Sequence, residues 1–193
     1  YKKSQHHFFT ASAIFEKLND TENYISSNVG YIDVLVKDKQ FTKAENAITT
    51  LVPLAFQYGV DFPIGITLKA KGDYHFARAE YTIAVVQYLM AIEYLTVNES
   101  HIQKLNARTL VRIAEAYKRL ENREKTVEYY EKALAIYTDL NEIKSMARTF
   151  NTLAEAQRYL GNLVLALDYA LQSLALHGQI DDAEGRAKAL MGA

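Results

Sequence analysis

The chain repeats itself at a shift of 40 positions. Residues 107–116 superimpose without gaps on residues 147–156, and Leu120 meets Leu160 at the same shift. The first segment opens with Ala-Arg-Thr-Leu and the second with Ala-Arg-Thr-Phe. A fixed period of this length indicates a repeat architecture, in which stacked copies of one helical or stranded unit bury each other's apolar faces.

Each repeat has the pattern of two helices. In the third repeat the pattern predicts a first helix over 107–120, a turn over 121–124 and a second helix over 125–140. Small residues such as Ala114 and Ala133 stand among large apolar residues at helical spacing, which lets two helices approach closely. The chain has only 2 Pro and 8 Gly. A sandwich or barrel of this length needs more turn residues, so we expect an all-α fold.

The units resemble the tetratricopeptide repeat, which pairs two antiparallel helices. The resemblance implies a right-handed α-solenoid of antiparallel helix pairs, with about nine or ten helices. We expect one solenoid over 1–193, with whole repeats at 25–64, 65–106, 107–146 and 147–186, a partial unit at 1–24 and a truncated unit at 187–193. The residues that carry the match in the third repeat are Leu110, Ile113, Ala114, Tyr117, Tyr130 and Ala133, and those that fit a second helix in the partial unit are Tyr1, Phe8 and Ala11.

Local departures from regular helix are expected around the end of the first repeat. Pro53 lies late in a second helix, which it should kink or end. Gly59 suits a chain reversal, and Asp61 suits a helix N-cap with Pro63 in the first turn. These residues together predict an irregular corner over 57–64.

The second repeat allows two registers. Gly72-Asp73-Tyr74 either lies inside a first helix or forms the turn between two helices. The first register is favoured, because only that one keeps the 40-residue period on both sides.

Composition and motifs exclude several classes of function. The net charge of -1 gives no overall attraction to nucleic acid or to an anionic membrane. The absence of Cys rules out disulfides, thiolate zinc sites and thiol catalysis. No apolar run approaches the roughly 20 residues that a membrane-spanning helix needs. No phosphate-binding glycine pattern, nucleophile elbow or histidine metal spacing is present. We therefore expect a non-catalytic fragment of a larger protein, without cofactor, metal or nucleic acid.

One acidic residue recurs at the same slot of four successive repeats: Asp33, Asp73, Glu115 and Glu155. Such a ladder permits acid–base work or cation binding. Intrahelical pairing is the favoured interpretation, because basic residues follow one turn later. The expected partners are Lys118 and Arg119 for Glu115, and Arg158 for Glu155.

The family resemblance places five slots of each first helix on an inner, concave face. In the second repeat these slots are nearly neutral and include Lys69, Asp73 and Phe76. Over the later repeats six cations face two carboxylates, a formal charge of +4. We expect this groove to bind a peptide, with the following lining residues there: Arg108, Val111, Glu115, Lys118, Arg119, Arg148, Asn151, Glu155, Arg158, Tyr159 and Lys188.

Units with this long period resemble the sensory or regulatory regions of bacterial signalling proteins, where they accompany a diguanylate cyclase, a histidine kinase or a transcription regulator. The resemblance implies a peptide or protein partner, and the cationic slots favour an acidic or C-terminal segment. A peptide-pheromone receptor and a stand-alone assembly adaptor are the alternatives. The compartment stays open, although the analogy favours an extracytoplasmic sensor region.

The two ends of the expected solenoid carry apolar residues that a neighbouring repeat would cover. These residues predict a homodimer formed by pairing of the solenoid ends. They are Phe8, Phe9 and Ile14 at one end, and Leu190 and Met191 at the other.

Overall fold

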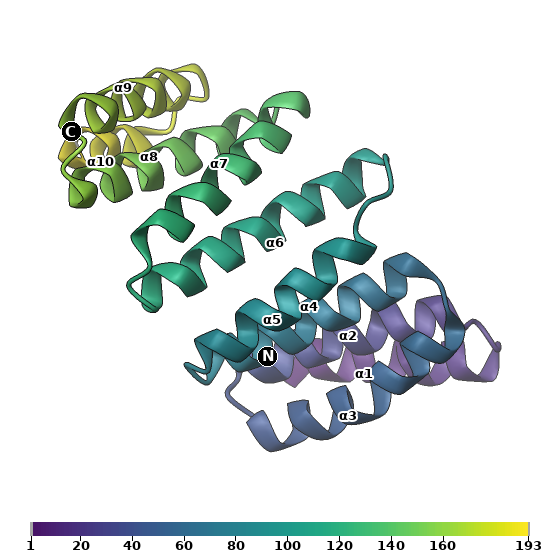
Figure 1. Cartoon of the computed structure of the whole chain (residues 1–193). Coiled ribbons are helices and arrows are strands. Elements are labelled where there is room, and N and C mark those ends of the chain that lie inside the picture. The colour runs from purple at the N-terminus through teal and green to yellow at the C-terminus, as the bar shows by residue number, and fades with distance from the viewer. Residues whose placement is uncertain (1, 193) are drawn as a thin grey trace. The chain divides into compact units, whose positions relative to one another are not determined.

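The computed structural model describes residues 2–192, and within that range it contains ten α-helices and no strand (Figure 1). This confirms the expected all-α fold. Tyr1, predicted to fill a packing slot, lies outside the described residues. The helices are α1 (Lys2–Lys17), α2 (Thr21–Lys37), α3 (Phe41–Tyr58), α4 (Asp61–Ala77), α5 (Tyr81–Tyr94), α6 (Ser100–Arg119), α7 (Arg123–Asp139), α8 (Ile143–Leu160), α9 (Leu163–Gln179) and α10 (Ala183–Gly192).

Short turns make successive helices antiparallel. Most connections have only two or three residues, and one residue of each adopts the left-handed conformation. Lys39, Ala79 and Glu121 do so with φ of 57°, 62° and 58°. Gly59 and Gly161, with φ of 73° and 83°, supply the same conformation without a side-chain penalty. Reversal within so few residues gives the antiparallel helix pairs that the repeat pattern predicted.

The chain divides into two compact units, which we describe separately. The N-terminal unit runs to Val97 and contains α1 to α5. Its core is built from α2, α3, α4 and α5, with Ile32, Leu35 and Leu68 at most 2% exposed. The ring of Phe8 on α1 packs closely against Gly30 of α2. A Cβ on that glycine would lie 2.4 Å from the ring, so the close contact requires glycine.

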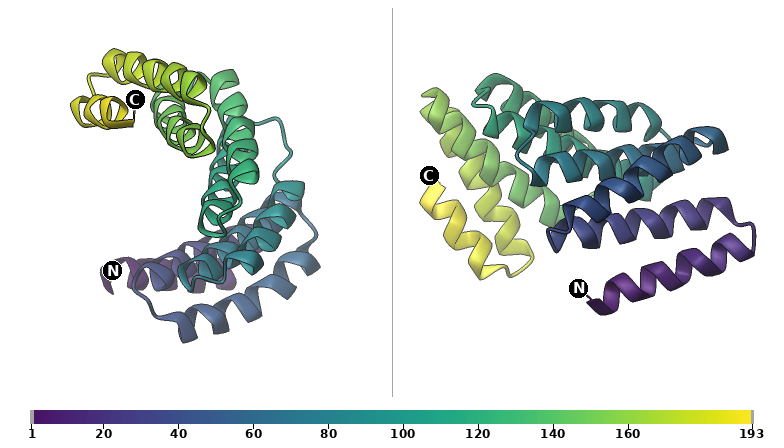
Figure 2. Two further views of the ribbon diagram at one scale, coloured as in Figure 1. Left: turned by 60° about the vertical axis from the view of Figure 1, so that its left-hand side comes forward. Right: turned by 90° about the horizontal axis from the view of Figure 1, so that it is seen from below.

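The C-terminal unit begins at Asn98 and contains α6 to α10. Within it α8 packs against α7, α9 and α10, and Figure 2 shows α10 beside α8 and α9. The buried face of α8 carries Leu153 and Ala154, both 0% exposed, and Ala133 of α7 is equally buried. Small and large side chains therefore alternate at the helix contacts, as the repeat pattern predicted.

The end of the first repeat differs from two predictions. Pro53, expected to kink or end its helix, does not end it, since α3 continues to Tyr58. Proline has no N–H, so the carbonyl of Thr49 loses its helical hydrogen-bond donor. Both residues are exposed, and water can take the place of that donor. Asp61 is the first residue of α4 and not its N-cap, which is Val60. Pro63 does lie in the first turn of α4, as expected.

The irregular corner lies elsewhere than predicted. Only Gly59 and Val60 separate α3 from α4, whereas residues 95–99 between α5 and α6 form the longest connection in the described chain. The favoured register of the second repeat is confirmed, because α4 runs through Gly72 without a break. In the third repeat α6 begins at Ser100, ahead of the predicted 107, because Ile102 continues the buried stripe of the helix. A single solenoid over the whole chain stays a prediction.

None of the helices in the described range is both long enough and apolar enough to span a bilayer.

Candidate functional site

The C-terminal unit contains an open pocket of about 690 Å³ between α8, the C-terminal end of α9 and the first turns of α10. Helix α8 contributes one wall, and α10 contributes the opposite wall. His177 and Ile180 close the pocket from the end of α9. The full lining is Lys144, Arg148, Asn151, Thr152, His177, Ile180, Asp182, Glu184, Gly185 and Lys188.

The local sequence explains why a hollow forms here. Shifted by one period, His177 takes the slot of Tyr137, a larger buried side chain that stands near Arg108 and Glu142. Gly185 lets α10 approach the imidazole, since a Cβ there would lie 2.0 Å from Nδ1 of His177. The fourth repeat therefore has a smaller ring at this slot than the third, with a glycine of the next helix packed against it.

The pocket carries a cationic wall. Lys144, Arg148 and Lys188 stand against Asp182 and Glu184, a formal charge of +1. Nζ of Lys188 donates to Oε1 of Glu184 at 2.6 Å, which lowers the pKa of that carboxyl. Lys144 and Arg148 have no ion pair in the part of the chain that the structure describes, but their charges help to lower the pKa values of Asp182 and Glu184 respectively. The pocket therefore keeps a net charge of +1 for a ligand.

Two buried polar atoms in this pocket lack hydrogen-bond partners among the described residues. They are Oδ1 of Asn151 and Nδ1 of His177. His177 is only 2% exposed, and its Nδ1 lies 3.1 Å from Oδ2 of Asp182 without hydrogen-bond alignment. A buried polar atom without a partner is costly. The unpaired amide oxygen of Asn151 can accept from a hydrogen-bond donor, whereas the cations of the pocket wall attract an anion.

Acid is expected to loosen α10 from this pocket. Oδ1 of Asp182 accepts from the backbone N–H of Gly185 at 2.9 Å, which holds the Asp182 pKa below its ordinary 3.8, with His177 and Lys144 adding to the effect. Since the folded-state pKa is the lower one, this stability exists above about pH 3.8 and is lost as the pH falls below it. Backbone amide resonances of α10, followed by NMR through that range, should report the loosening.

The matched variant for this pH effect is Asp182→Asn. An amide still caps the helix but does not titrate, so the pH response of α10 should flatten. An unchanged response in Asp182→Asn would show that another group controls the docking of α10.

Three predicted ligand residues lie together in the pocket: Arg148 and Asn151 on α8, and Lys188 on α10. Two more, Lys118 and Tyr159, line a second hollow of about 340 Å³ beside the turn between α6 and α7. These five residues therefore line two separate hollows in the C-terminal unit, and a continuous binding groove stays a prediction.

The remaining predicted residues lie outside both hollows. Arg108 and Arg119 are exposed on α6, and Val111 is half-buried there. Arg158 lies over the ring of Tyr159, with its guanidinium carbon 5.6 Å from the ring centroid. These side chains belong to the surface around the hollows.

In the N-terminal unit the three predicted residues are bound to their neighbours. Lys69 donates to Asp73 at 2.6 Å, and the Phe76 ring meets Tyr81 edge-on with centroids 5.2 Å apart. All three lie on α4.

The acid ladder is paired, but with other partners than the sequence predicted in the later repeats. Glu115 accepts from Arg112 at 2.7 Å, not from Lys118 or Arg119. Glu155 accepts from Lys118 of the neighbouring first helix at 3.1 Å, while Arg158 turns to Tyr159. The earlier acids pair within their helices at 2.6 Å, Asp33 with Lys37 and Asp73 with Lys69.

A tyrosine of a second helix ties one of these acids to the core, and a second tyrosine lies close to two others. The hydroxyl of Tyr88 on α5 donates to Oδ1 of Asp73 at 2.7 Å. Tyr130 takes the same slot on α7, where burial and the nearby charges of Glu115 and Glu155 raise its pKa. The ladder therefore joins helices, and no group of three or more acidic, His or Cys residues suited to a metal occurs in the described chain.

Most of the pocket residues on α9, on α10 and in the turn between them were not predicted as ligand residues from the sequence. His177, Asp182 and Gly185 were not singled out, although His177 stands where Tyr137 stands one period earlier. That substitution of a shorter polar ring at a buried slot was the available signal. Lys144 and Thr152 also line the pocket from α8.

Residues 105–179 match the sequence model of the family described as Tetratricopeptide repeat. This segment is a tetratricopeptide repeat array. It covers most of α6 and all of α7, α8 and α9, including the pocket residues up to His177. No curated protein sequence matches the chain.

Solved structures extend the fold to nearly the whole chain. BtubC (BKLC) from P. vanneervenii is 14% identical over 99% of this chain and 80% of its own, with a TM-score of 0.83. Aspartyl phosphate phosphatase F from Bacillus subtilis is 13% identical over 96% of this chain, with a TM-score of 0.81. A signal transduction ATPase with a tetratricopeptide repeat sensor, from Pyrococcus horikoshii, is 14% identical over 89% of this chain, with a TM-score of 0.78. The chain spans 48% and 26% of the last two proteins. At these identities the likeness shows the fold alone.

Proposed function

We propose that this chain is a recognition region whose C-terminal unit binds an acidic peptide segment in the pocket between α8 and α10. The tetratricopeptide repeat is a protein-interaction scaffold, so a protein or peptide partner follows from the fold. The acidic character of the partner rests on Arg148 and Lys144, which have no ion pair in the described chain. The observation that carries the proposal is the pair of unpartnered buried atoms, Oδ1 of Asn151 and Nδ1 of His177, in that same pocket.

A peptide supplies the groups that these atoms lack. Its carboxylates match the Lys and Arg side chains of the cationic wall. Its backbone N–H groups can donate to Oδ1 of Asn151, and the hydroxyl of Thr152 stands next to it on α8. A ligand with both groups removes the desolvation cost of the unpaired amide and adds charge-assisted hydrogen bonds to the exposed Lys144 and Arg148.

Arg148→Glu is expected to weaken binding of a Glu-rich peptide with a free C-terminus by about tenfold or more, because a charge-assisted hydrogen bond is replaced by repulsion. Fluorescence anisotropy of the labelled peptide gives the affinity. The matched control is Arg158→Glu, which makes the same charge change on the same helix but outside the pocket. Equal affinity in wild type and Arg148→Glu, or an equal loss in both variants, would contradict a site in this pocket.

We further propose that the recognition region is non-catalytic and regulates a larger bacterial signalling protein. Support comes from the long repeat period and from the similar fold of a signal transduction ATPase whose tetratricopeptide repeats are named as its sensor. A ligand that binds one conformation of the repeats better than another would shift the equilibrium between them. A peptide-pheromone receptor and a stand-alone adaptor stay as alternatives, and the diguanylate cyclase association stays a prediction.

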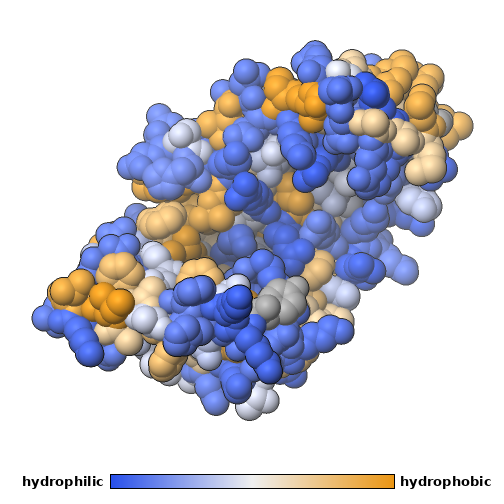
Figure 3. Space-filling model, turned by 180° about the vertical axis from the view of Figure 1, so that it is seen from behind, coloured by the Kyte–Doolittle hydropathy of each residue, from blue (hydrophilic) through white to orange (hydrophobic). Residues whose placement is uncertain are grey.

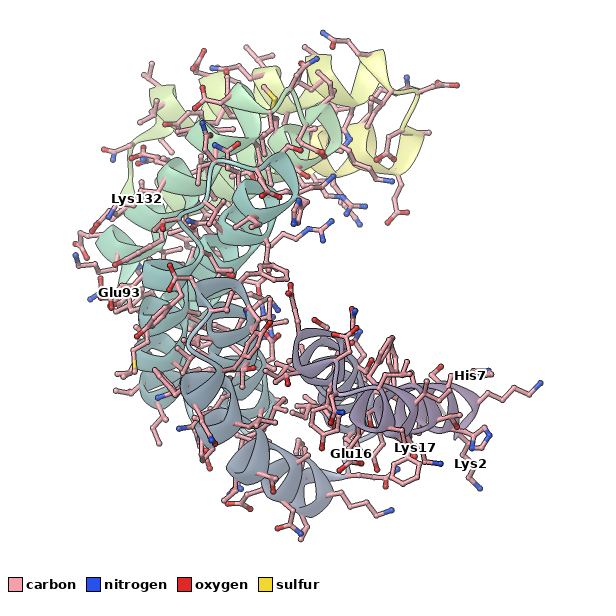
Figure 4. All side chains as sticks on the ribbon, turned by 90° about the vertical axis from the view of Figure 1, so that its right-hand side faces the viewer. Lys2, His7, Glu16, Lys17, Glu93 and Lys132 are labelled. Atoms are coloured by element: carbon pink, nitrogen blue, oxygen red, sulfur yellow. The ribbon has the colours of Figure 1, made fainter. Side chains whose placement is uncertain are left out.

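Pairing of the chain's two ends also stays a prediction. Phe9 and Ile14 are 63% and 51% exposed, and Leu190 and Met191 are 63% and 76% exposed. Phe8, also expected to be uncovered, is partly buried against Gly30. Figure 4 shows Lys2, His7 and Lys17 projecting from α1. The ring of Phe9 lies beside that of Tyr31, with centroids 6.4 Å apart.

A further inference from the structure

Helix α9 carries an apolar strip on its outer surface. Leu163, Leu167 and Leu171 follow one another at every fourth position and are 64%, 49% and 55% exposed. Val164 beside them is 87% exposed. In Figure 3 apolar atoms gather at the upper right, over the C-terminal helices. We call these four residues the α9 strip.

The repeat does not require this strip. One period earlier, on α7, charged residues take three of the four positions: Arg123 for Leu163, Glu124 for Val164 and Glu131 for Leu171. Leu167 matches Val127, which is apolar and only 9% exposed. The fold therefore accepts charged residues at the positions of Leu163, Val164 and Leu171, and these three apolar residues of α9 need a different explanation.

The strip is separate from the contacts that hold α9 in place. Ala166, Ala170 and Ser173 form the buried face, and the hydroxyl of Ser173 donates to the carbonyl of Ala147 at 2.8 Å. On another flank the hydroxyl of Tyr169 donates to Glu131 of α7 at 3.1 Å. Helices α8 and α10 pack against α9, Tyr169 links one flank of it to α7, and the strip residues belong to none of these printed contacts.

We propose that the α9 strip pairs with the α9 strip of a second copy of this chain. The near absence of charged side chains on the outer face of α9 favours an uncharged, apolar partner surface. Asp168 is the only exposed charged side chain of α9, and it is already hydrogen-bonded by Gln172 at 2.7 Å. Without Lys or Arg beside it, the strip lacks the electrostatic attraction to anionic lipid that interfacial helices use. An equally uncharged, apolar strip is its complement, and the chain itself supplies one.

The spacing also fits a symmetric contact. Residues at every fourth position form a ridge, and two such ridges interdigitate when helices cross in the commonest packing class. A two-fold axis brings the same patch of both copies together and closes the assembly at a dimer. Because the strip covers only a little over two helical turns, we expect a small interface and a weak, concentration-dependent dimer.

Single-cysteine variants test this pairing directly, because the chain has no Cys. Leu167→Cys at the centre of the strip should give a disulfide-linked dimer under mild oxidation. Glu124→Cys, at the matching face of α7, should stay monomeric. Leu190→Cys together with Phe9→Cys reports pairing of the chain's ends. Cross-linking at the ends without cross-linking at Leu167 overturns the proposal.

Sedimentation velocity of the unmodified chain and of two charge variants completes the test. Wild type should associate as its concentration rises, whereas Leu167→Glu and Val164→Asp should remain monomers with unchanged far-UV circular dichroism. A wild type that stays monomeric throughout overturns the proposal, as does association that persists in both variants. Flotation of wild type with neutral or anionic vesicles would show instead that lipid is the occupant.

The pairing and the peptide pocket use different residues. Variants of the α9 strip should therefore leave peptide affinity unchanged, and Arg148→Glu should leave the dimer intact. Either proposal can thus fail without the other.

Discussion

Replacing Leu153 by Ala is expected to lower the free energy of unfolding of the C-terminal unit by about 3 kcal/mol. Leu153 is 0% exposed and lies at the centre of α8, the helix that packs against α7, α9 and α10. Truncation removes buried methyl groups and leaves a cavity, because the surrounding helices relax only partly. Urea unfolding followed by circular dichroism at a helical wavelength measures the loss, and the chain has no Trp to report it by fluorescence.

The matched control for this loss is Leu171→Ala on the adjacent helix. Leu171 is 55% exposed, so the same chemical change should cost about 1 kcal/mol or less. It should be measured at a concentration where the chain is monomeric. Similar losses in the two variants would mean that α8 is not the central helix of its unit.

Gly72→Ala is expected to destabilise the N-terminal unit by about 1–3 kcal/mol, although alanine is the better helix former. A Cβ at this position would lie 2.5 Å from the ring of Tyr88. The ring is 0% exposed, and its hydroxyl is fixed on Asp73, so it cannot swing away without losing a buried hydrogen bond. Urea unfolding again gives the change, with hydrogen exchange of α4 and α5 amides locating it.

Gly178→Ala separates the steric effect from helix propensity. Gly178 lies near the end of α9, and a Cβ there meets no atom within 4 Å. This variant should be neutral or gain up to about 1 kcal/mol. If Gly72→Ala also leaves the free energy of unfolding unchanged or raises it, then α4 and α5 do not approach each other closely at Tyr88.

The repeat pattern was enough to predict the helix pairs and most of their buried faces. Leu110, Ile113 and Ala114 were expected in packing slots, and all three are at most 5% exposed. This works because helical periodicity and the alternation of small and large residues are local properties of the sequence. Helix starts were less predictable, as α6 shows, because a helix can extend ahead of the repeat when its apolar stripe continues.

The site depends on contacts between distant residues, which the local pattern does not contain. Glu155 pairs with Lys118 across 37 positions, whereas the intrahelical rule favoured Arg158. The pocket itself needs His177 in a tyrosine slot together with a glycine on the next helix. Arg148, Asn151 and Lys188 were predicted from the inner slots of their repeats, and those three do line the pocket.

The most direct test of the central claim is an NMR titration of the C-terminal pocket with the Glu-rich peptide. The account predicts that the side-chain amide of Asn151 and the imidazole of His177 shift on binding, together with the backbone amides of α10 near Gly185. Both side chains should gain hydrogen-bond partners that they lack in the free protein. Shifts that occur only in the N-terminal unit or along the α9 strip, with Asn151 and His177 unmoved, would contradict it.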